Sequence, residues 1–346
     1  MIELDKIEDG VVSMFKVNLG VQKGERILVL TDVPTAEEWE KQGSERLNAM
    51  VRRAALAKMV SEIAKKKFPD CAVKFYAYPS VGRNGVEPGK AVEGRMKAAD
   101  VIVAITTYSL THTDARSSAN EAGARVASMP EFLPEMFYPG GPMTADYNEI
   151  LRETEKLVEL MNKAETAVVR SKAGTDITMS LKGRIGIVDG GFFTEPGVFG
   201  NLPSGEAFIA PVEGTANGRV VIEAGWFPDL EENLVFRFKN GKVVGIEGGG
   251  KVGDRYRELL GIGKEGALYE ARRNCAELGI GTNPNAKRLD NVLEAEKIRG
   301  TVHIAVGDNA HMGGKVNADL HQDFVIQKPT LILDGKTIMK NGKLKI

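Results

Sequence analysis

The chain has few of the features that mark secreted proteins and thiolate metal sites. Only two cysteines, Cys71 and Cys275, occur in its 346 residues, and they lie far apart without CxxC spacing. This pattern excludes a disulfide framework and a zinc site built from thiolates. Any metal ion would have to be held by His, Asp and Glu side chains.

Charge and hydropathy argue against two further classes of partner. The 46 Lys and Arg residues nearly balance the 47 Asp and Glu residues, which removes the long-range positive field that a nucleic acid backbone needs. No apolar run reaches the roughly 20 residues that cross a bilayer. The first ten residues are acidic where a signal peptide would be basic and then apolar. We therefore expect a cytoplasmic protein that binds neither nucleic acid nor membrane.

Two domains are expected, because the chain exceeds the length at which one hydrophobic core usually suffices. Residues 1–165 alternate β-branched runs with segments of helical periodicity, which predicts a Rossmann-like, mostly parallel α/β sheet with helices on both faces. No GxGxxG sequence joins the first strand to the first helix, so a dinucleotide site is not expected. Strands are predicted at 26–31, 71–77, 100–106 and 124–128, and helices at 49–67, 91–98, 113–122 and 145–163.

Residues 166–346 have a different pattern, with short strands broken by Gly, Pro and Asn and one helix at about 265–276. Asn240-Gly241 lies between two alternating runs, which is a strong hairpin signal, and Asn341-Gly342 repeats it near the end. The second domain is therefore predicted to be mainly β.

Three of the four histidines lie within nineteen residues of one another: His303, His311 and His321. His321 and Asp323 stand two apart in LHQDFVI, so a strand would place both side chains on one face. Such a pair can hold an ion or form a simple hydrogen-bonded pair. His303 lies in the apolar run TVHIAVG, where a buried imidazole must be hydrogen-bonded or metal-bound. The neighbouring HQD favours metal binding.

Three glutamates are further candidates for the same site. Glu277 follows the predicted helix at 265–276, where the negative end of the helix disfavours a carboxylate. A salt bridge to Arg272 or Arg273 would compensate this charge, and so would a metal ion. Glu206 opens a predicted strand after the turn NLPSG, and Glu296 stands seven residues before the first histidine of the cluster. The patterns around Glu206 and Glu296 are equally typical of solvated surface charges.

Seven segments, in order over nearly the whole chain, resemble the aminopeptidase T and aminopeptidase S family of metallopeptidases. They are VQKGERILVL, LTHTDAR with GARVASMP, GTDITMSLKGR, NLPSGEAFIAP, AELGIGTNP, GTVHIAVG and the closing HQD. The resemblance implies a homodimer of two-domain chains with an enclosed active site. It also implies a pair of divalent metal ions whose ligands are Glu206, Glu277, Glu296, His303, His321 and Asp323.

The function that this resemblance implies is a metal-dependent aminopeptidase that releases N-terminal residues from small peptides. Two ions of Zn, Co or Mn, with Fe also suitable, would activate the attacking water. Glu277 or Glu296 would pass a proton to the leaving amine.

The chain departs from the family pattern at two places. Glu296 precedes His303 by seven residues rather than five, and Ala310 followed by His311 stands where the family places a catalytic tyrosine. Either His311 replaces that phenol as a transition-state donor or the substrate differs.

Two other functions remain open. Ring-cleaving dihydroxypyridine dioxygenases resemble the same family in fold and use a single Fe(II). The absent tyrosine favours this alternative, whereas retention of Glu206 and Glu277 argues against it, since one iron has no use for so many carboxylates. The other alternative is a non-catalytic relative in which the polar cluster is only a hydrogen-bonded core. The number of metal ions bound per chain would separate these hypotheses.

Overall fold

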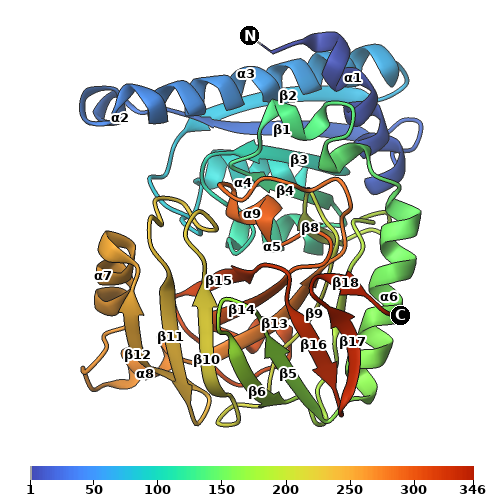
Figure 1. Ribbon diagram of the computed structural model, residues 1–346. Helices are drawn as coiled ribbons and strands as arrows, with labels where there is room; N and C mark the ends of the chain where they lie inside the picture. Colours follow the sequence, from blue (N-terminus) through green and yellow to red (C-terminus); the bar gives the residue numbers. More distant parts are fainter. Residues whose placement is uncertain (1) are drawn as a thin grey trace. The chain divides into compact units, whose positions relative to one another are not determined.

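The computed structural model describes residues 2–346, which divide into two compact units (Figure 1). Unit 1 runs to Tyr147 and includes Gly191–Ser204, and unit 2 consists of Asn148–Gly190 and Gly205–Ile346. This division differs from the expected boundary near residue 165. Nearly all of the helix that precedes that boundary belongs to unit 2, and a later segment returns to unit 1.

Unit 1 is built on a parallel sheet, sheet A, with strand order β2-β1-β3-β4-β8. Its strands are β1 (Arg26–Val33), β2 (Ala72–Pro79), β3 (Val101–Thr106), β4 (Arg125–Pro130) and β8 (Phe199–Asn201). Its α-helices are α1 (Leu4–Ser13), α2 (Ala36–Lys41), α3 (Ser44–Lys67), α4 (Lys90–Lys97) and α5 (Asp114–Glu121). Shorter helical turns are η1 (Met14–Asn18), η2 (Pro134–Phe137) and η3 (Pro142–Thr144). The predicted mostly parallel α/β sheet is confirmed.

The strands β1, β3 and β4 of sheet A are buried on both faces because helices cover both (Figure 1), whereas most side chains of the edge strand β2 are partly or fully exposed. Leu28 and Leu30 of β1 lie in one core cluster with Val92 and Met96 of α4. The long helix α3 packs against β1, β2 and β3. This explains why β1 and β3 are continuous apolar runs rather than alternating ones.

Unit 2 consists mainly of two antiparallel sheets. Sheet B has the order β12-β11-β10-β6-β5-β16-β17-β18, and sheet C has the order β15-β14-β13-β9-β7. The strands of sheet B are β5 (Thr166–Arg170), β6 (Asp176–Ser180), β10 (Asn217–Ile222), β11 (Leu234–Lys239), β12 (Lys242–Gly248), β16 (Thr330–Leu333), β17 (Lys336–Lys340) and β18 (Lys343–Leu344). Those of sheet C are β7 (Ile187–Asp189), β9 (Glu206–Ile209), β13 (Cys275–Gly281), β14 (Val302–Gly307) and β15 (His321–Ile326). The helices are α6 (Tyr147–Lys163), α7 (Gly250–Leu259), α8 (Ala267–Arg272), α9 (Val292–Ala295) and the turn η4 (Ala310–Met312).

One hydrophobic core is shared by the two sheets of unit 2. Phe236 from sheet B lies 4.4 Å, centroid to centroid, from Phe324 of β15. Leu278, Ile304 and Phe324 point into this core from three adjacent strands of sheet C. Side chains alternate between the two faces of a strand, so the residues directly before and after each of these three in its own strand lie on the opposite face.

In unit 2 the structure contains the predicted hairpin at Asn240-Gly241, but the predicted helix at 265–276 is shorter. Asn240 and Gly241 both have positive φ, 49° and 76°, as the tight hairpin between β11 and β12 requires. The helix expected at 265–276 is shorter than predicted, because α8 ends at Arg272 and β13 already begins at Cys275. Within residues 2–346, no helix is both long and apolar enough to cross a membrane.

Candidate metal centre

The face of sheet C that points away from the shared core carries a cluster of polar side chains. The alternation that sends Leu278 and Ile304 into the core sends their neighbours to this face. Its charged and imidazole members are Asp189 in β7, Glu206 in β9, Glu277 in β13, His303 in β14, and His321 and Asp323 in β15.

Strand register brings these residues together from distant parts of the chain. Ala305 of β14 pairs with Glu277 on one side and with Asp323 on the other. His303 is opposite Gly279, where an added Cβ would lie 1.8 Å from His303 Nε2. Small residues on this face therefore leave the room that the larger polar groups occupy.

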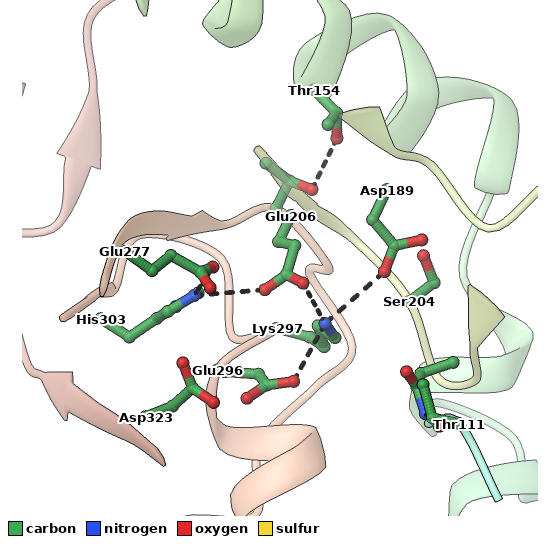
Figure 2. Close-up of polar contacts among 12 residues, drawn as sticks. Thr111, Thr154, Asp189, Ser204, Glu206, Glu277, Glu296, Lys297, His303 and Asp323 are labelled. Carbon is green, nitrogen blue, oxygen red and sulfur yellow. Dashed lines mark hydrogen bonds and ion pairs between the residues drawn. The ribbon is translucent and has the colours of Figure 1, made fainter. Parts of the chain in front are cut away.

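Glu277 lies between the two imidazoles of the cluster. Its Oε1 is 3.1 Å from His303 Nε2, and its Oε2 is 3.1 Å from His321 Nε2. Figure 2 shows the contact with His303. Each imidazole thus directs its Nε2 atom at the carboxylate of Glu277.

The tautomer of His321 is set by the loop after β14. Its Nδ1 donates a hydrogen bond of 2.7 Å to the backbone carbonyl of Asp308. This leaves Nε2 facing Glu277 and, at 3.6 Å, Asp323 Oδ1. A histidine that donates from one ring nitrogen and presents the other is arranged as metal-binding histidines usually are.

A buried lysine that the sequence reasoning missed completes the cluster. The side chain of Lys297 is 2% exposed, and three carboxylates surround its ammonium group (Figure 2). Its Nζ lies 2.5 Å from Glu206 Oε1, 3.0 Å from Glu296 Oε1 and 3.5 Å from Asp189 Oδ2. In the sequence, EAEKIRG is typical of a solvated helix, and no spacing signal marks its lysine as buried.

Burial and mutual proximity shift the pKa values of this cluster strongly. Burial raises the pKa of Glu206 to about 6 and that of Glu296 to about 8, although Lys297 opposes both shifts. Burial would lower the pKa of His303, but the hydrogen bond to Glu277 and the nearby carboxylates raise it to about 9. The carboxylates therefore favour positive charge at this position, and the same field would attract a divalent cation.

Burial would also raise the pKa of Glu277, yet the contacts with His303 and His321 lower it below its ordinary value. The pKa of His321 lies well above its ordinary value, because Asp323 and Glu277 outweigh the effect of burial. Metal binding would require loss of the proton from His321, since only a neutral imidazole can donate a lone pair.

Several expectations about individual residues need correction. Glu277 does not sit at the end of a helix, because it lies inside β13. The arginines proposed to compensate it are engaged elsewhere: Arg272 pairs with Asp319, and Arg273 pairs with Glu270.

Glu206 and Glu296 are not solvated surface charges, because both carboxylates contact the buried ammonium of Lys297. His311 lies beside the cluster: its Nδ1 is 2.5 Å from Asp308 Oδ2, and its ring centroid is 5.3 Å from that of His321.

Within residues 2–346, two groups of side chains place oxygen or nitrogen atoms close enough to hold a metal ion. One is Glu206, Glu277 and His303, and the other is Glu277, His321 and Asp323. Glu277 belongs to both. The second group is more open, since the side chains of His321 and Asp323 are 21% and 17% exposed.

The chain is similar over nearly all of its length to a family of known enzymes. Residues 11–346 match the family model of NicX, 2,5-dihydroxypyridine 5,6-dioxygenase. The chain belongs to this family. The 2,5-dihydroxypyridine 5,6-dioxygenase of Pseudomonas putida KT2440 is 25% identical to it over an alignment of 269 residues, and the match covers 73% of this chain and 73% of the relative.

Two solved structures share the fold. The 2,5-dihydroxypyridine dioxygenase of Pseudomonas putida KT2440 superposes with a TM-score of 0.73 at 19% identity, covering 100% of this chain and 98% of the other. AmpT of Thermus thermophilus superposes with a TM-score of 0.64 at 15% identity, covering 99% of both chains. The expected relationship to the aminopeptidases is thus one of fold.

Membership of the dioxygenase family overturns the aminopeptidase prediction. The hydrolase activity and the peptide substrate inferred from the resemblance were both wrong, because the family is one of oxidoreductases. The proton-relay role of Glu277 or Glu296 and the replacement of a phenol by His311 belonged to the peptidase mechanism. Both assignments are withdrawn with it.

Proposed function

We propose that this protein is a ring-cleaving dioxygenase that acts on a dihydroxylated pyridine such as 2,5-dihydroxypyridine and uses one Fe(II) ion. Family membership and the name of the Pseudomonas putida relative support the reaction class. One feature of the site carries the metal assignment. His321 is held by the Asp308 carbonyl so that its Nε2 faces Glu277 and Asp323.

The donor set suits Fe(II). Glu277, His321 and Asp323 offer one imidazole nitrogen and two carboxylate oxygens, with no sulfur, and such hard-to-borderline donors bind iron or manganese. The partial exposure of His321 and Asp323 fits a catalytic metal, which must keep coordination positions open for other ligands. When bound, Fe(II) would supply the redox chemistry that joins O2 to the ring.

The other residues of the cluster would orient these three ligands. His303 donates from Nε2 to Glu277 Oε1, which leaves Oε2 on the His321 side. The Asp308 carbonyl keeps His321 in the tautomer that presents Nε2. Such supporting hydrogen bonds typically change metal affinity or activity by about 10- to 100-fold when removed.

The reaction balances without an external reductant. The bond between ring carbons 5 and 6 breaks, and both atoms of O2 end in the ring-opened product. The ring is oxidised by the oxygen that it takes up. A direct test therefore uses protein purified without oxygen, stripped of metal and reloaded with Fe(II).

With 2,5-dihydroxypyridine and ¹⁸O₂, we expect equal consumption of substrate and oxygen and a product that contains both labelled atoms. Protein loaded with redox-inactive Zn(II) is the control and should consume neither. Fe(II)-loaded protein that binds the substrate without consuming oxygen would contradict the proposed activity and favour a non-catalytic role.

A pair of matched variants tests the metal assignment. Asp323→Asn should abolish Fe(II) binding and oxygen consumption together, because it removes a proposed ligand. Asp319→Asn makes the same chemical change at a half-exposed residue paired with Arg272 and should keep both. If Asp323→Asn retained its iron, the metal would have to lie elsewhere.

A further inference from the structure

Lys297 is a charged side chain that the proposed chemistry does not use. Its ammonium is buried among the carboxylates of three other residues, and within residues 2–346 these are its ion-pair partners: Asp189, Glu206 and Glu296. An ammonium group has three N–H donors, and here three carboxylates face it. Lysines are almost never fully buried unless they are paired, so this arrangement is a built cation site.

Lys297 is held in place by its backbone. It follows α9, its N–H donates to the carbonyl of Glu294 at 3.1 Å, and its carbonyl accepts from the N–H of Asn283 at 2.9 Å. Gly281 of β13 allows this close approach, because an added Cβ there would lie 2.7 Å from the carbonyl oxygen of Glu296. The backbone of Lys297 is therefore fixed beside sheet C, and the three ion pairs hold its ammonium.

Glu206 connects this position to the candidate metal centre. Its Oε1 contacts Lys297, whereas its Oε2 lies 3.4 Å from His303 Nε2 and has no hydrogen-bond partner among residues 2–346. A carboxylate that directs its two oxygens at two separate cationic positions is what a pair of metal ions about 3.5 to 4 Å apart would need. In this chain the ammonium of Lys297 occupies the position beside Glu206 Oε1.

We propose that the Lys297 ammonium replaces a second divalent cation and so restricts the centre to one metal ion. It occupies the oxygens of Glu206, Glu296 and Asp189 that a second ion would need, and its positive charge repels an ion placed beside it. It cannot leave without stranding buried carboxylates. The metal is thereby confined to the group formed by Glu277, His321 and Asp323.

This proposal answers the objection that a one-iron site has no use for so many carboxylates. Glu206 and Glu296 bind the lysine, and Glu277 and Asp323 remain for the metal. It rests on the proposed function only in requiring that the protein hold a metal ion at all.

The test counts metal ions rather than turnover. Wild-type protein, Lys297→Met and Lys297→Arg are dialysed to equilibrium against Mn(II), and bound metal per folded chain is measured by mass spectrometry. We expect one ion in the wild type, two in Lys297→Met, and one in Lys297→Arg, which keeps the positive charge. Two neighbouring Mn(II) ions should also show magnetic coupling in electron paramagnetic resonance, which a second ion bound elsewhere would not.

Loss of the ammonium can also destabilise the fold, so a second variant is required. Lys297→Met combined with Asp189→Asn removes one buried negative charge and leaves Glu206 and Glu296 for the metal. Two ions in either folded variant support the proposal. A single ion in both, or two in the wild type, overturns it and makes Lys297 a purely structural ion-pair partner. If both variants fold only when Mn(II) is added, the number of ions bound per folded chain still decides: two support the proposal and one overturns it.

The outcomes also separate this proposal from the proposed function. Wild type that binds one ion but consumes no oxygen contradicts the dioxygenase activity and leaves the role of Lys297 intact. A wild type that binds one Fe(II) and cleaves the ring, together with a folded Lys297→Met that gains no ion, contradicts the role of Lys297 alone. Wild type that binds no metal contradicts both.

Discussion

Each unit buries a carboxylate near other charged groups, but the two units satisfy these charges in opposite ways. In unit 1, Asp32 of β1 is 1% exposed and accepts hydrogen bonds from the backbone N–H groups of Thr107, at 2.6 Å, and Tyr108, at 3.1 Å. In unit 2, Glu277 receives its two contacts from the imidazoles of His303 and His321.

The difference lies in whether the partner can be exchanged. Backbone N–H groups are fixed dipoles that hold a carboxylate permanently, so Asp32 is satisfied within the fold. An imidazole can lose its proton and present a lone pair instead, so the carboxylates around His321 can exchange a proton for a metal ion. Two similarly buried carboxylates therefore differ in their partners: those of Asp32 are fixed backbone dipoles, whereas those of Glu277 are titratable side chains.

The largest contrast should come from removing one group in each unit. His321→Ala should abolish metal binding and lower oxygen consumption by more than about 100-fold, because the loss of a ligand exceeds the loss of a supporting hydrogen bond. Asp32→Asn should keep its metal and lower the free energy of unfolding by about 1 to 3 kcal/mol, since it weakens a buried hydrogen-bonded network. Metal analysis and urea unfolding of both variants check the comparison. Loss of metal from Asp32→Asn would contradict the purely structural role expected for Asp32.

The stability of the metal-free protein should fall as pH rises. The pKa of His303 is raised from 6.5 to about 9, so its stabilising effect is complete below pH 6.5 and is lost as pH rises through 9. Glu206 and Glu296 have pKa values raised from 4.5 to about 6 and about 8, so their neutral forms stabilise the fold below pH 4.5 and this effect is lost as pH rises through those values.

The three effects have the same sign between pH 5 and 9, and that of His303 is at most about 3 kcal/mol. Urea unfolding of stripped protein across this range measures the decline. Metal-loaded protein is the control and should show a smaller decline, because a bound cation replaces the protons. A metal-free protein that became more stable over the same pH range would contradict the raised pKa values of His303, Glu206 and Glu296.

Gly279→Ala should disturb the site by a purely steric route. The added Cβ would lie 1.8 Å from His303 Nε2, so the ring has to leave its contact with Glu277. Overpacking of this kind lowers the free energy of unfolding by about 1 to 3 kcal/mol, and the metal affinity should fall with it. Gly94→Ala is the matched control in unit 1, where an added Cβ meets nothing within 4 Å. Gly94 lies on the exposed face of α4, so this change should be neutral or stabilising by up to about 1 kcal/mol.

The smallest effect is expected at His311. Its side chain is 40% exposed and contacts the carboxylate of Asp308, whereas His321 is held by the Asp308 backbone carbonyl. Exposed ion pairs contribute about 0 to 1 kcal/mol. We therefore expect His311→Ala to keep its metal and to lower oxygen consumption by less than about tenfold. A larger loss of rate at unchanged metal content would show that His311 contacts the substrate.

Much of the fold could be predicted because its signals are local. The apolar runs at 26–31 and 100–106 became β1 and β3, and Asn240-Gly241 became the hairpin it predicts. Glu277 was misplaced because the helical pattern at 265–276 was extended past Arg272, where strand pairing with β14 takes over. Periodicity in a short segment cannot detect such a long-range pairing.

Composition and spacing alone determined that histidines and carboxylates gather near the end of the chain and that strand alternation puts His321 and Asp323 on one face. Only the tertiary structure decided what surrounds them. Sheet register sets Glu277 between two imidazoles, and the loop after α9 carries Lys297 to three carboxylates. The physical reason is that burial and contact depend on residues far away in sequence, so a lysine looks the same in the sequence whether water or carboxylates surround it.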